Sequence, residues 1–284
     1  MSYVRLTKRK RPYFETDRSC NLAHDLDNAS IHERIVEATV LWSLALYSKT
    51  VMQILNKTNF SGEADQLSRL IKKRDDGRGL VTVCNHVSAI DDPGAVAAVM
   101  PVSALPNGSN YRWTACATDR CFRTLALFPF FRGGKVLPVV RGGGLRQYGV
   151  DLMVAKLQRG DWVHMFPEGR RSREGELRPF KIGVGRLVAD PKRTPLVVPF
   201  YHCGMSQVLR RGETVPLTVG KQMHIEVGEP MDFSNLVRTM REKGIEETEI
   251  YRRIAKDIER AVSELRLRAL DKYDIDSLPI DRPK

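Results

Sequence analysis

Short apolar segments alternate with segments of helical periodicity from about Gly79 onward, and this alternation restricts the fold more than any other feature of the chain. Between residues 149 and 158, for example, Val150, Met153 and Leu157 recur at a helical spacing. Such alternation predicts an α/β fold: a single domain with a mixed, largely parallel sheet flanked by helices. We expect strands at 80–84, 111–117, 135–140, 162–166, 196–201 and 223–227, and helices at 92–100, 120–127, 149–158, 182–189 and 246–270.

The composition permits a packed core and indicates an anionic partner. Of 284 residues, 42% are hydrophobic and 28% are charged, which suits one large domain or two small ones. The net charge of +12 indicates a nucleic acid, an anionic membrane surface or a phosphate-bearing substrate. We expect no nucleic acid, because the chain has neither a zinc finger nor the aromatic and basic interleaving of RNA-recognition modules. A membrane-binding module without activity is a further alternative.

The most apolar stretch spans residues 35–55, and its centre, 38–48, carries no charge. A helix that crosses a bilayer needs about 20 apolar residues, so this stretch is too short. It fits an N-terminal membrane-associating helix that enters one leaflet, with Trp42 and Tyr47 as interfacial anchors. An ordinary core helix is the alternative.

The cysteines are odd in number and form no Cys-x-x-Cys pair. We therefore interpret them as reduced thiols of an intracellular protein rather than as a disulfide framework. They are Cys20, Cys84, Cys116, Cys121 and Cys203.

His86 and Asp91 stand five positions apart in a polar loop directly after the expected strand 80–84. A carboxylate on one ring nitrogen fixes the imidazole tautomer, and the other nitrogen can then take a proton from an alcohol. Because the chain lacks a Gly-x-Ser-x-Gly elbow, the base would act on a hydroxyl of the substrate. Two alternatives stay open: Asp91 or Asp92 caps a helix that begins at Pro93, or these carboxylates and His86 bind a metal.

A second polar turn, Phe166-Pro167-Glu168-Gly169, follows the expected strand 162–166. Glu168 is either a simple turn residue or a carboxylate on a rigid elbow that binds substrate hydroxyls or braces a cation. Arg170, Arg171 and Arg173 follow it, and Arg141 ends the expected strand 135–140. Guanidinium groups at strand ends suit bidentate phosphate recognition, although a solvated charge run is the alternative for 170–173.

Four motifs occur in the order seen in the glycerolipid acyltransferase superfamily, which the chain resembles from about residue 38 to about residue 233. They are Asn85-His86-x-Ser88-x-x-Asp91, Val139-Val140-Arg141-Gly142, Phe166-Pro167-Glu168-Gly169 and Pro195-Leu196-Val197-Val198-Pro199. Within this superfamily the chain is most similar to the phospholipid–lysophospholipid transacylases. The tract 160–169 and Gly183-x-Gly185-Arg186-Leu187 carry that closer match.

The resemblance implies an O-acyltransferase with an α/β fold that acts on phospholipids and lysophospholipids at an anionic membrane surface, with no metal and no organic cofactor. This branch remodels cardiolipin without coenzyme A, which implies a peripheral or monotopic protein of the mitochondrial inner or outer membrane, facing the intermembrane space. His86 would be the base and Asp91 its partner. The implied substrate-binding residues are Asn85, Ser88, Arg141, Gly142, Phe166, Pro167, Glu168 and Gly169.

One departure concerns the acyl donor. The run 168–173 resembles the Glu-Gly-Thr-Arg-Ser form of coenzyme A-dependent relatives, so acyl-CoA is the alternative donor. We expect a basic tail at 1–34, a monotopic membrane-associating segment at 35–57, an acyltransferase domain at 58–233 and a C-terminal helical segment at 234–284. Loops are expected at 57–78, 107–110, 142–144 and 210–216.

Overall fold

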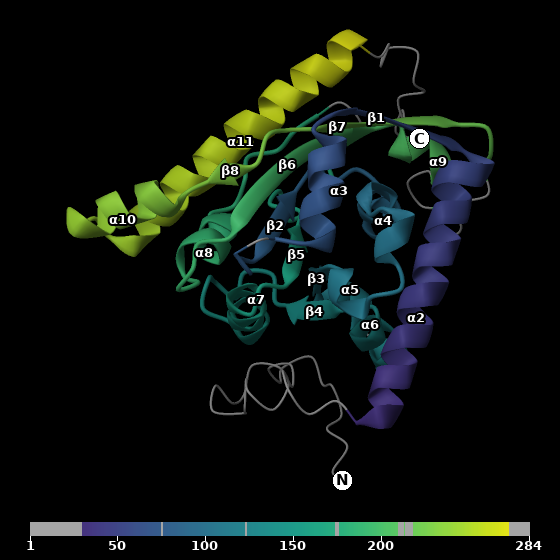
Figure 1. Ribbon diagram of the computed structural model, residues 1–284, viewed down its shortest axis with the longest axis horizontal. Helices are drawn as coiled ribbons and strands as arrows, with labels where there is room; N and C mark the ends of the chain where they lie inside the picture. Colours follow the sequence, from purple (N-terminus) through teal and green to yellow (C-terminus); the bar gives the residue numbers. More distant parts are fainter. Residues whose placement is uncertain are drawn as a thin grey trace.

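The computed structural model describes residues 30–272, except 75, 123, 174–175, 210–212 and 214–217. Within them, an eight-stranded sheet lies between two layers of helices (Figure 1). The strand order is β1-β7-β6-β2-β5-β3-β4, and β8 pairs with β6. The strands are β1 (Lys57–Gly62), β2 (Leu80–Val83), β3 (Trp113–Ala117), β4 (Val136–Val139), β5 (Trp162–Met165), β6 (Leu196–Cys203), β7 (Gln222–Val227) and β8 (Met231–Asp232).

The helices differ greatly in length. π-Helical turns cover Thr50–Leu55 and Asp91–Ala95, and 3₁₀ turns cover Val102–Ala104, Gly108–Asn110 and Leu125–Leu127. The α-helices are α2 (Ile31–Lys49), α3 (Ala64–Lys72), α4 (Val96–Val99), α5 (Thr118–Cys121), α6 (Phe128–Gly133), α7 (Tyr148–Gln158), α8 (Gly183–Ala189), α9 (Met205–Val208), α10 (Ser234–Glu242) and α11 (Glu247–Lys272).

The sheet confirms the predicted mixed, largely parallel arrangement. All pairs are parallel except those of β6 with β7 and with β8. In this register Val83 of β2 lies opposite Met165 of β5 and Pro199 of β6. Parallel strands end at the same edge of a sheet. The segments that follow β2 and β5, which carry His86 and Glu168, therefore begin side by side.

Alternate residues of the central strands face opposite helix layers, as the period of two in a strand requires. On β6, Val197 and Tyr201 face a core formed with α7, α8, α10 and α11. Val198 and Phe200 face a second core, formed with α2, α3, α4 and α9. Figure 1 shows α11 along one side of the sheet and α2 along the other.

The N-terminal apolar stretch is helical and buries only a narrow face. Ser30 is the N-cap of α2, and its side chain and that of Glu33 form a reciprocal capping box. Only Leu41, Ala45 and Ser48 are buried in it. No helix among the described residues is long and apolar enough to cross a membrane. Of the expected basic tail 1–34, residues 1–29 lie outside the described part.

The expectation of a loop at 57–78 is wrong, because this segment forms β1 and α3. β1 has Phe60 as its one large apolar residue and lies at the edge of the described sheet beside β7, and an edge position removes the need for two apolar faces. In α3, Leu67 and Ile71 are one helical turn apart and both are buried. The expected helix at 120–127 is also wrong: α5 ends at Cys121 and a separate 3₁₀ turn follows.

The C-terminal helices belong to the same core as the rest of the domain. Ile254, Ile258 and Val262 of α11 are fully buried in the core that β6 and α8 share. Gly185 of α8 meets Tyr251 so closely that a Cβ would lie 2.0 Å from the Tyr251 carbonyl oxygen. The packing of α11 therefore crosses the boundary expected at residue 233, and the C-terminal segment expected at 234–284 stays a prediction.

Candidate active site

The loop after β2 folds around the carboxylate of Asp91. His86 Nδ1 donates to Asp91 Oδ2 at 2.8 Å, and the backbone N–H groups of Val87 and Ser88 donate to the same oxygen at 2.6 and 2.9 Å. The predicted contact between His86 and Asp91 is therefore present. Because the carboxylate can only accept, Nδ1 carries the hydrogen, and Nε2 is left to accept a proton.

Asp91 is held as a carboxylate in a buried position. Burial acts to raise its pKa, but nearby His202 and the hydrogen bond from His86 lower it by more, so the pKa lies below the ordinary value. The Asp91 side chain is fully buried, whereas that of His86 is 23% exposed. Neither aspartate caps the following helix, because Asp92 instead forms an ion pair with the buried Arg112.

Glu168 joins the two motifs through backbone groups. Its Oε1 accepts the N–H of His86 at 2.8 Å, and its Oε2 accepts the N–H of Arg178 at 2.9 Å. The side chain is buried, which raises its pKa, although these two hydrogen bonds oppose the rise. The sequence predicted that the Glu168 carboxylate binds substrate or braces a cation. In the structure this carboxylate binds the backbone N–H of His86.

Two further residues hold His86. The ring of Phe166 stacks on the imidazole, with ring centres 4.2 Å apart and planes 23° apart. The N–H and the hydroxyl of Ser172 donate to the His86 carbonyl at 2.7 and 3.1 Å. Phe166 was expected to bind substrate, which stays a prediction. In the structure its ring supports the imidazole of His86.

The side chains of Asn85 and Ser88 bind backbone groups of the protein. Both are buried, and the Asn85 amide bonds the backbone N–H and carbonyl of His202 at 2.9 Å each. Ser88 Oγ donates to the carbonyl of Leu209. These contacts hold the loop against β6 and the end of α9, and the substrate-binding role expected for the two residues stays a prediction.

A basic cavity of about 430 Å³ opens beside this loop and shares Glu168 with it. Arg178 has a buried Nε that lacks a hydrogen-bond partner among the described residues. Such an N–H is costly unless an anion or water meets it. The cavity is lined by Arg141, Glu168, Gly169, Arg170, Arg178, Pro179 and Lys181.

Gly169 and Pro167 both contact Lys181, which lines this cavity. Gly169 has a φ of +68°, and a Cβ there would lie 2.7 Å from Lys181 Nζ. Glycine at 169 therefore lets the lysine cross into the cavity. The Pro167 carbonyl accepts the N–H of Lys181 at 2.9 Å. Gly142 lies in an exposed turn beside Arg141, with a φ of +78°, outside the cavity lining.

Arg178 and Lys181 were not among the residues that the sequence predicted. Both lie after the Glu168 turn, in a segment that returns to the end of β5. Their basic character is visible in the sequence, but the return of this segment is not. Among the described residues, no three histidine, cysteine or acidic side chains are grouped as a metal site.

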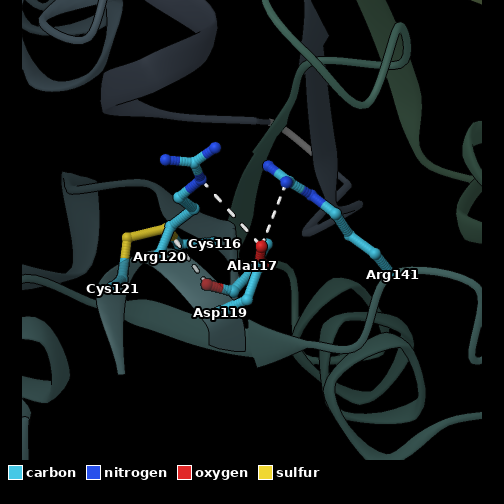
Figure 2. The surroundings of a disulfide bond; sticks show 6 residues. All are labelled: Cys116, Ala117, Asp119, Arg120, Cys121 and Arg141. Carbon is cyan, nitrogen blue, oxygen red and sulfur yellow. Dashed lines mark hydrogen bonds and ion pairs between the residues drawn. A yellow bond between two sulfur atoms is a disulfide. The ribbon is translucent and has the colours of Figure 1, made fainter. Parts of the chain in front are cut away.

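Arg141 is held from the neighbouring strand, as Figure 2 shows. Its Nη1 donates to Asp119 Oδ2 at 3.2 Å, and both side chains are about half exposed. Asp119 lies in a short turn that a Cys116–Cys121 disulfide closes. The expectation that all cysteines are reduced thiols is therefore wrong for this pair. β3 ends at Ala117 and α5 turns back at once, which brings the two Cα atoms within 6.0 Å.

Comparison with known proteins identifies the family. A family model described as Acyltransferase matches residues 63–203. N-acylphosphatidylethanolamine synthase of Arabidopsis thaliana is 34% identical over 202 residues, which cover 69% of this chain and 70% of that protein. The chain belongs to the acyltransferase family. The family predicted from the four motifs is thus confirmed.

Tafazzins are also among the relatives of this acyltransferase. Tafazzin of Drosophila melanogaster is 34% identical over 241 residues, 85% of this chain. The chain spans 63% of the length of that protein and 62% of the taffazin of Dictyostelium discoideum, which is 36% identical. Among solved structures, the 1-acyl-sn-glycerophosphate (LPA) acyltransferase PlsC of Thermotoga maritima has a similar fold. Its TM-score is 0.54 at 18% identity, with 85% of each chain covered.

Proposed function

We propose that this acyltransferase is a tafazzin-type phospholipid–lysophospholipid transacylase that remodels membrane phospholipids such as cardiolipin. The observation that carries the proposal is the hydrogen-bonded pair of His86 and Asp91 at the edge of a basic cavity. Glu168 connects the two, since it lines the cavity and also binds the N–H of His86. A proton acceptor and an anion-binding cavity are the parts that a lysophospholipid acceptor requires.

The chemistry is direct acyl transfer. His86 Nε2 takes the proton of a lysophospholipid hydroxyl while that oxygen attacks the ester carbonyl of the donor phospholipid. The tetrahedral intermediate collapses, the ester bond to the leaving alkoxide breaks, and His86 returns the proton to that oxygen. Asp91 stabilises the imidazolium that forms between the two steps. Cys84 offers no covalent route, because it is fully buried and burial raises its pKa well above the ordinary value.

The cavity suits the phosphate of the lipid headgroup. Three cationic side chains, Arg141, Arg178 and Lys181, line the cavity. Guanidinium groups bind phosphate oxygens in pairs, which fixes orientation as well as position. A headgroup bound here holds the acceptor hydroxyl next to His86, which shares Glu168 with the cavity.

We further infer that α2 rests in one leaflet of a mitochondrial membrane that faces the intermembrane space. α6 packs on α2, with Gly133 against Val40. Residues of α2, of α6 and of the turn before α6 expose large apolar side chains that water would disfavour. They are Ile31, Ile35, Trp42, Leu46, Tyr47, Leu127 and Phe130.

Acyl-CoA is the second candidate donor. Arg170 and Arg173 are exposed next to the cavity, where cations are available to the phosphates of coenzyme A. One relative is named as an N-acylphosphatidylethanolamine synthase, so an amine is a second candidate acceptor. Each alternative keeps His86 as the base and changes only the partner in the cavity.

Acyl transfer to a labelled lysophospholipid by pure protein tests the proposal. Phosphatidylcholine alone and acyl-CoA alone serve as donors, and phosphatidylethanolamine replaces the lysolipid in a third arm. We expect transfer from phosphatidylcholine without coenzyme A, and none by His86→Ala. Transfer only from acyl-CoA assigns the protein to the coenzyme A-dependent branch, and transfer only to the amine assigns an N-acyltransferase. No transfer in any arm contradicts the proposal.

A further inference from the structure

A second imidazole faces Asp91 from the sheet, and the chemistry described so far does not use it. His202 lies on β6, fully buried, on the face that packs toward α4. Its Nε2 is 3.0 Å from the carbonyl oxygen of Asn85 and 3.8 Å from Asp91 Oδ2. The carbonyl can only accept, so Nε2 carries a hydrogen. One N–H dipole therefore points between the Asn85 carbonyl and the Asp91 carboxylate.

His202 and Asn85 are joined by three hydrogen bonds. The Asn85 amide binds both backbone groups of His202, and the His202 ring binds the Asn85 carbonyl in return. Asn85 directly precedes His86 in the chain. A shift of His202 is therefore transmitted to the backbone of His86 without passing through solvent.

The charge on Asp91 needs this neighbour. Three donors converge on Oδ2, while Oδ1 is buried without a partner among the described residues. A buried carboxylate is stabilised only by nearby hydrogen bonds, dipoles and charges. Burial raises the pKa of Asp91, and His202 and His86 are both among the neighbours that lower it.

We propose that His202 is a positioning residue for the acyl transfer, which holds the Asn85 carbonyl and the Asp91 carboxylate so that Asp91 stays aligned with His86. This inference rests on the proposed function of the His86 and Asp91 pair. It adds a residue from β6, 116 positions after His86 in the sequence, to a site otherwise built from the loops after β2 and β5.

Other titratable groups lie near His86 and Asp91, and their effects can be distinguished from that of His202. Burial lowers the pKa of His164 to about 3 and raises that of Cys84, so both stay neutral near neutral pH. Asp92 is paired with Arg112. Glu168 binds the backbone N–H of His86, so a readout on the His86 ring itself is needed to separate its titration from that of Glu168.

Two substitutions test the role of the ring N–H. His202→Leu removes it at similar volume, whereas His202→Gln places an amide N–H near the position of Nε2. We expect His202→Leu to lower kcat about tenfold, the order of one lost hydrogen bond in a buried network, with KM for the lysolipid changed less than about twofold. The acid limb of the pH profile of kcat/KM should shift, because Asp91 stabilises the imidazolium and His202→Leu changes both the alignment of Asp91 and the dipole beside it. His202→Gln should restore most of the wild-type kcat and most of the wild-type pH profile.

The matched control is His224→Leu, which removes an imidazole from β7, the neighbour of β6. Its kcat and pH profile should equal those of the wild type. If His202→Leu loses thermal stability and activity but keeps the wild-type pH profile, its role is only structural and the proposal is overturned. If His202→Leu does not fold, the pH profiles of His202→Gln and His202→Asn are compared instead. Only glutamine places its amide near the position of Nε2, so His202→Asn should show the shifted profile and His202→Gln should stay close to the wild type.

An activity-independent measurement separates this inference from the proposed function. The ring signal of His86, assigned by its loss in His86→Ala, is titrated by NMR in protein labelled at histidine. We expect the His86 midpoint in His202→Leu to differ from that in the wild type and in His224→Leu. An unchanged midpoint overturns the role of His202 even if the wild type transfers acyl groups. If the midpoint shifts but the wild-type protein transfers no acyl group, the positioning role of His202 is supported and only the proposed function is contradicted.

Discussion

Behind Glu168, which forms one wall of the cavity, His86 is held through its ring, its N–H and its carbonyl, and all three partners are buried. On the other wall, Arg141 is held by a single ion pair with Asp119, and both side chains are about half exposed. Buried hydrogen bonds to charged groups contribute about 1.5–3 kcal/mol, whereas exposed ion pairs contribute about 0–1 kcal/mol. The same cavity therefore has one rigid wall and one adjustable wall.

The difference matches what each wall has to do. Proton transfer requires the base within hydrogen-bond reach of one hydroxyl, and a misplacement of about 1 Å can cost about 100-fold in rate. Binding a phosphate requires charge and a fork of donors, which a flexible side chain can deliver in several positions. An enzyme that exchanges acyl chains among different lipids gains from fixing the chemistry while leaving the headgroup wall free to adapt.

The largest effect should come from the rigid wall. His86→Ala removes the base, and we expect kcat to fall about 10²–10⁴-fold. The thermal midpoint should change little, because the ring is partly exposed. Acyl transfer and a thermal melt on the same preparation measure both. Wild-type turnover by a folded His86→Ala protein would remove His86 from the chemistry.

Glu168→Gln should have the next largest effect, since it weakens the rigid wall without touching the base. The amide keeps one acceptor but turns an NH₂ toward the second backbone N–H. We expect kcat to fall about tenfold or more and the free energy of unfolding to fall by about 1–3 kcal/mol. The control is Glu176→Gln, an exposed glutamate of the same segment, which should change neither. Equal behaviour of the two variants in urea unfolding and turnover would show that Glu168 does not hold the wall.

The rigid wall is also the part that the sequence predicted best. His86 and Asp91 are five residues apart, so their contact is local, and the parallel order of β2 and β5 brings Glu168 beside them. The burial of Asn85 and Ser88 was not predicted, because polarity alone does not reveal burial. His202 was missed because its contact with Asn85 spans 117 positions and depends on β2 pairing with β6.

The adjustable wall was only partly predicted, for a different physical reason. Arg141 was identified because it ends a strand, but Arg178 and Lys181 lie on an irregular segment whose path no periodicity encodes. β1 was missed because an edge strand with one neighbour does not need the apolar pattern of a central strand. Sequence patterns thus report regular, buried elements, whereas the irregular segments that line the cavity follow from tertiary packing.

A smaller effect should come from the adjustable wall. Arg141→Gln removes one phosphate donor, so we expect KM for the lysophospholipid to rise about tenfold while kcat changes less than about threefold. Asp119→Asn releases Arg141 without removing it, and KM should change less than about threefold. Kinetics at low and high salt measure both, and the effect of Arg141→Gln should shrink as salt rises. If Asp119→Asn matches Arg141→Gln, the ion pair is essential and the wall is not adjustable.

The smallest effect on activity should follow loss of the Cys116–Cys121 disulfide. The bond closes a loop across only five positions, so its removal by Cys116→Ser should lower the free energy of unfolding by about 2 kcal/mol at most. Activity should stay within about twofold, because the bond reaches the substrate only through Asp119 and an exposed ion pair. Reduction of the wild type by dithiothreitol, followed by alkylation and mass spectrometry, should give the same result without a mutation. A tenfold loss of activity in both would mean that the turn fixes Arg141 as firmly as the buried contacts fix His86, and the contrast between the walls would then fail.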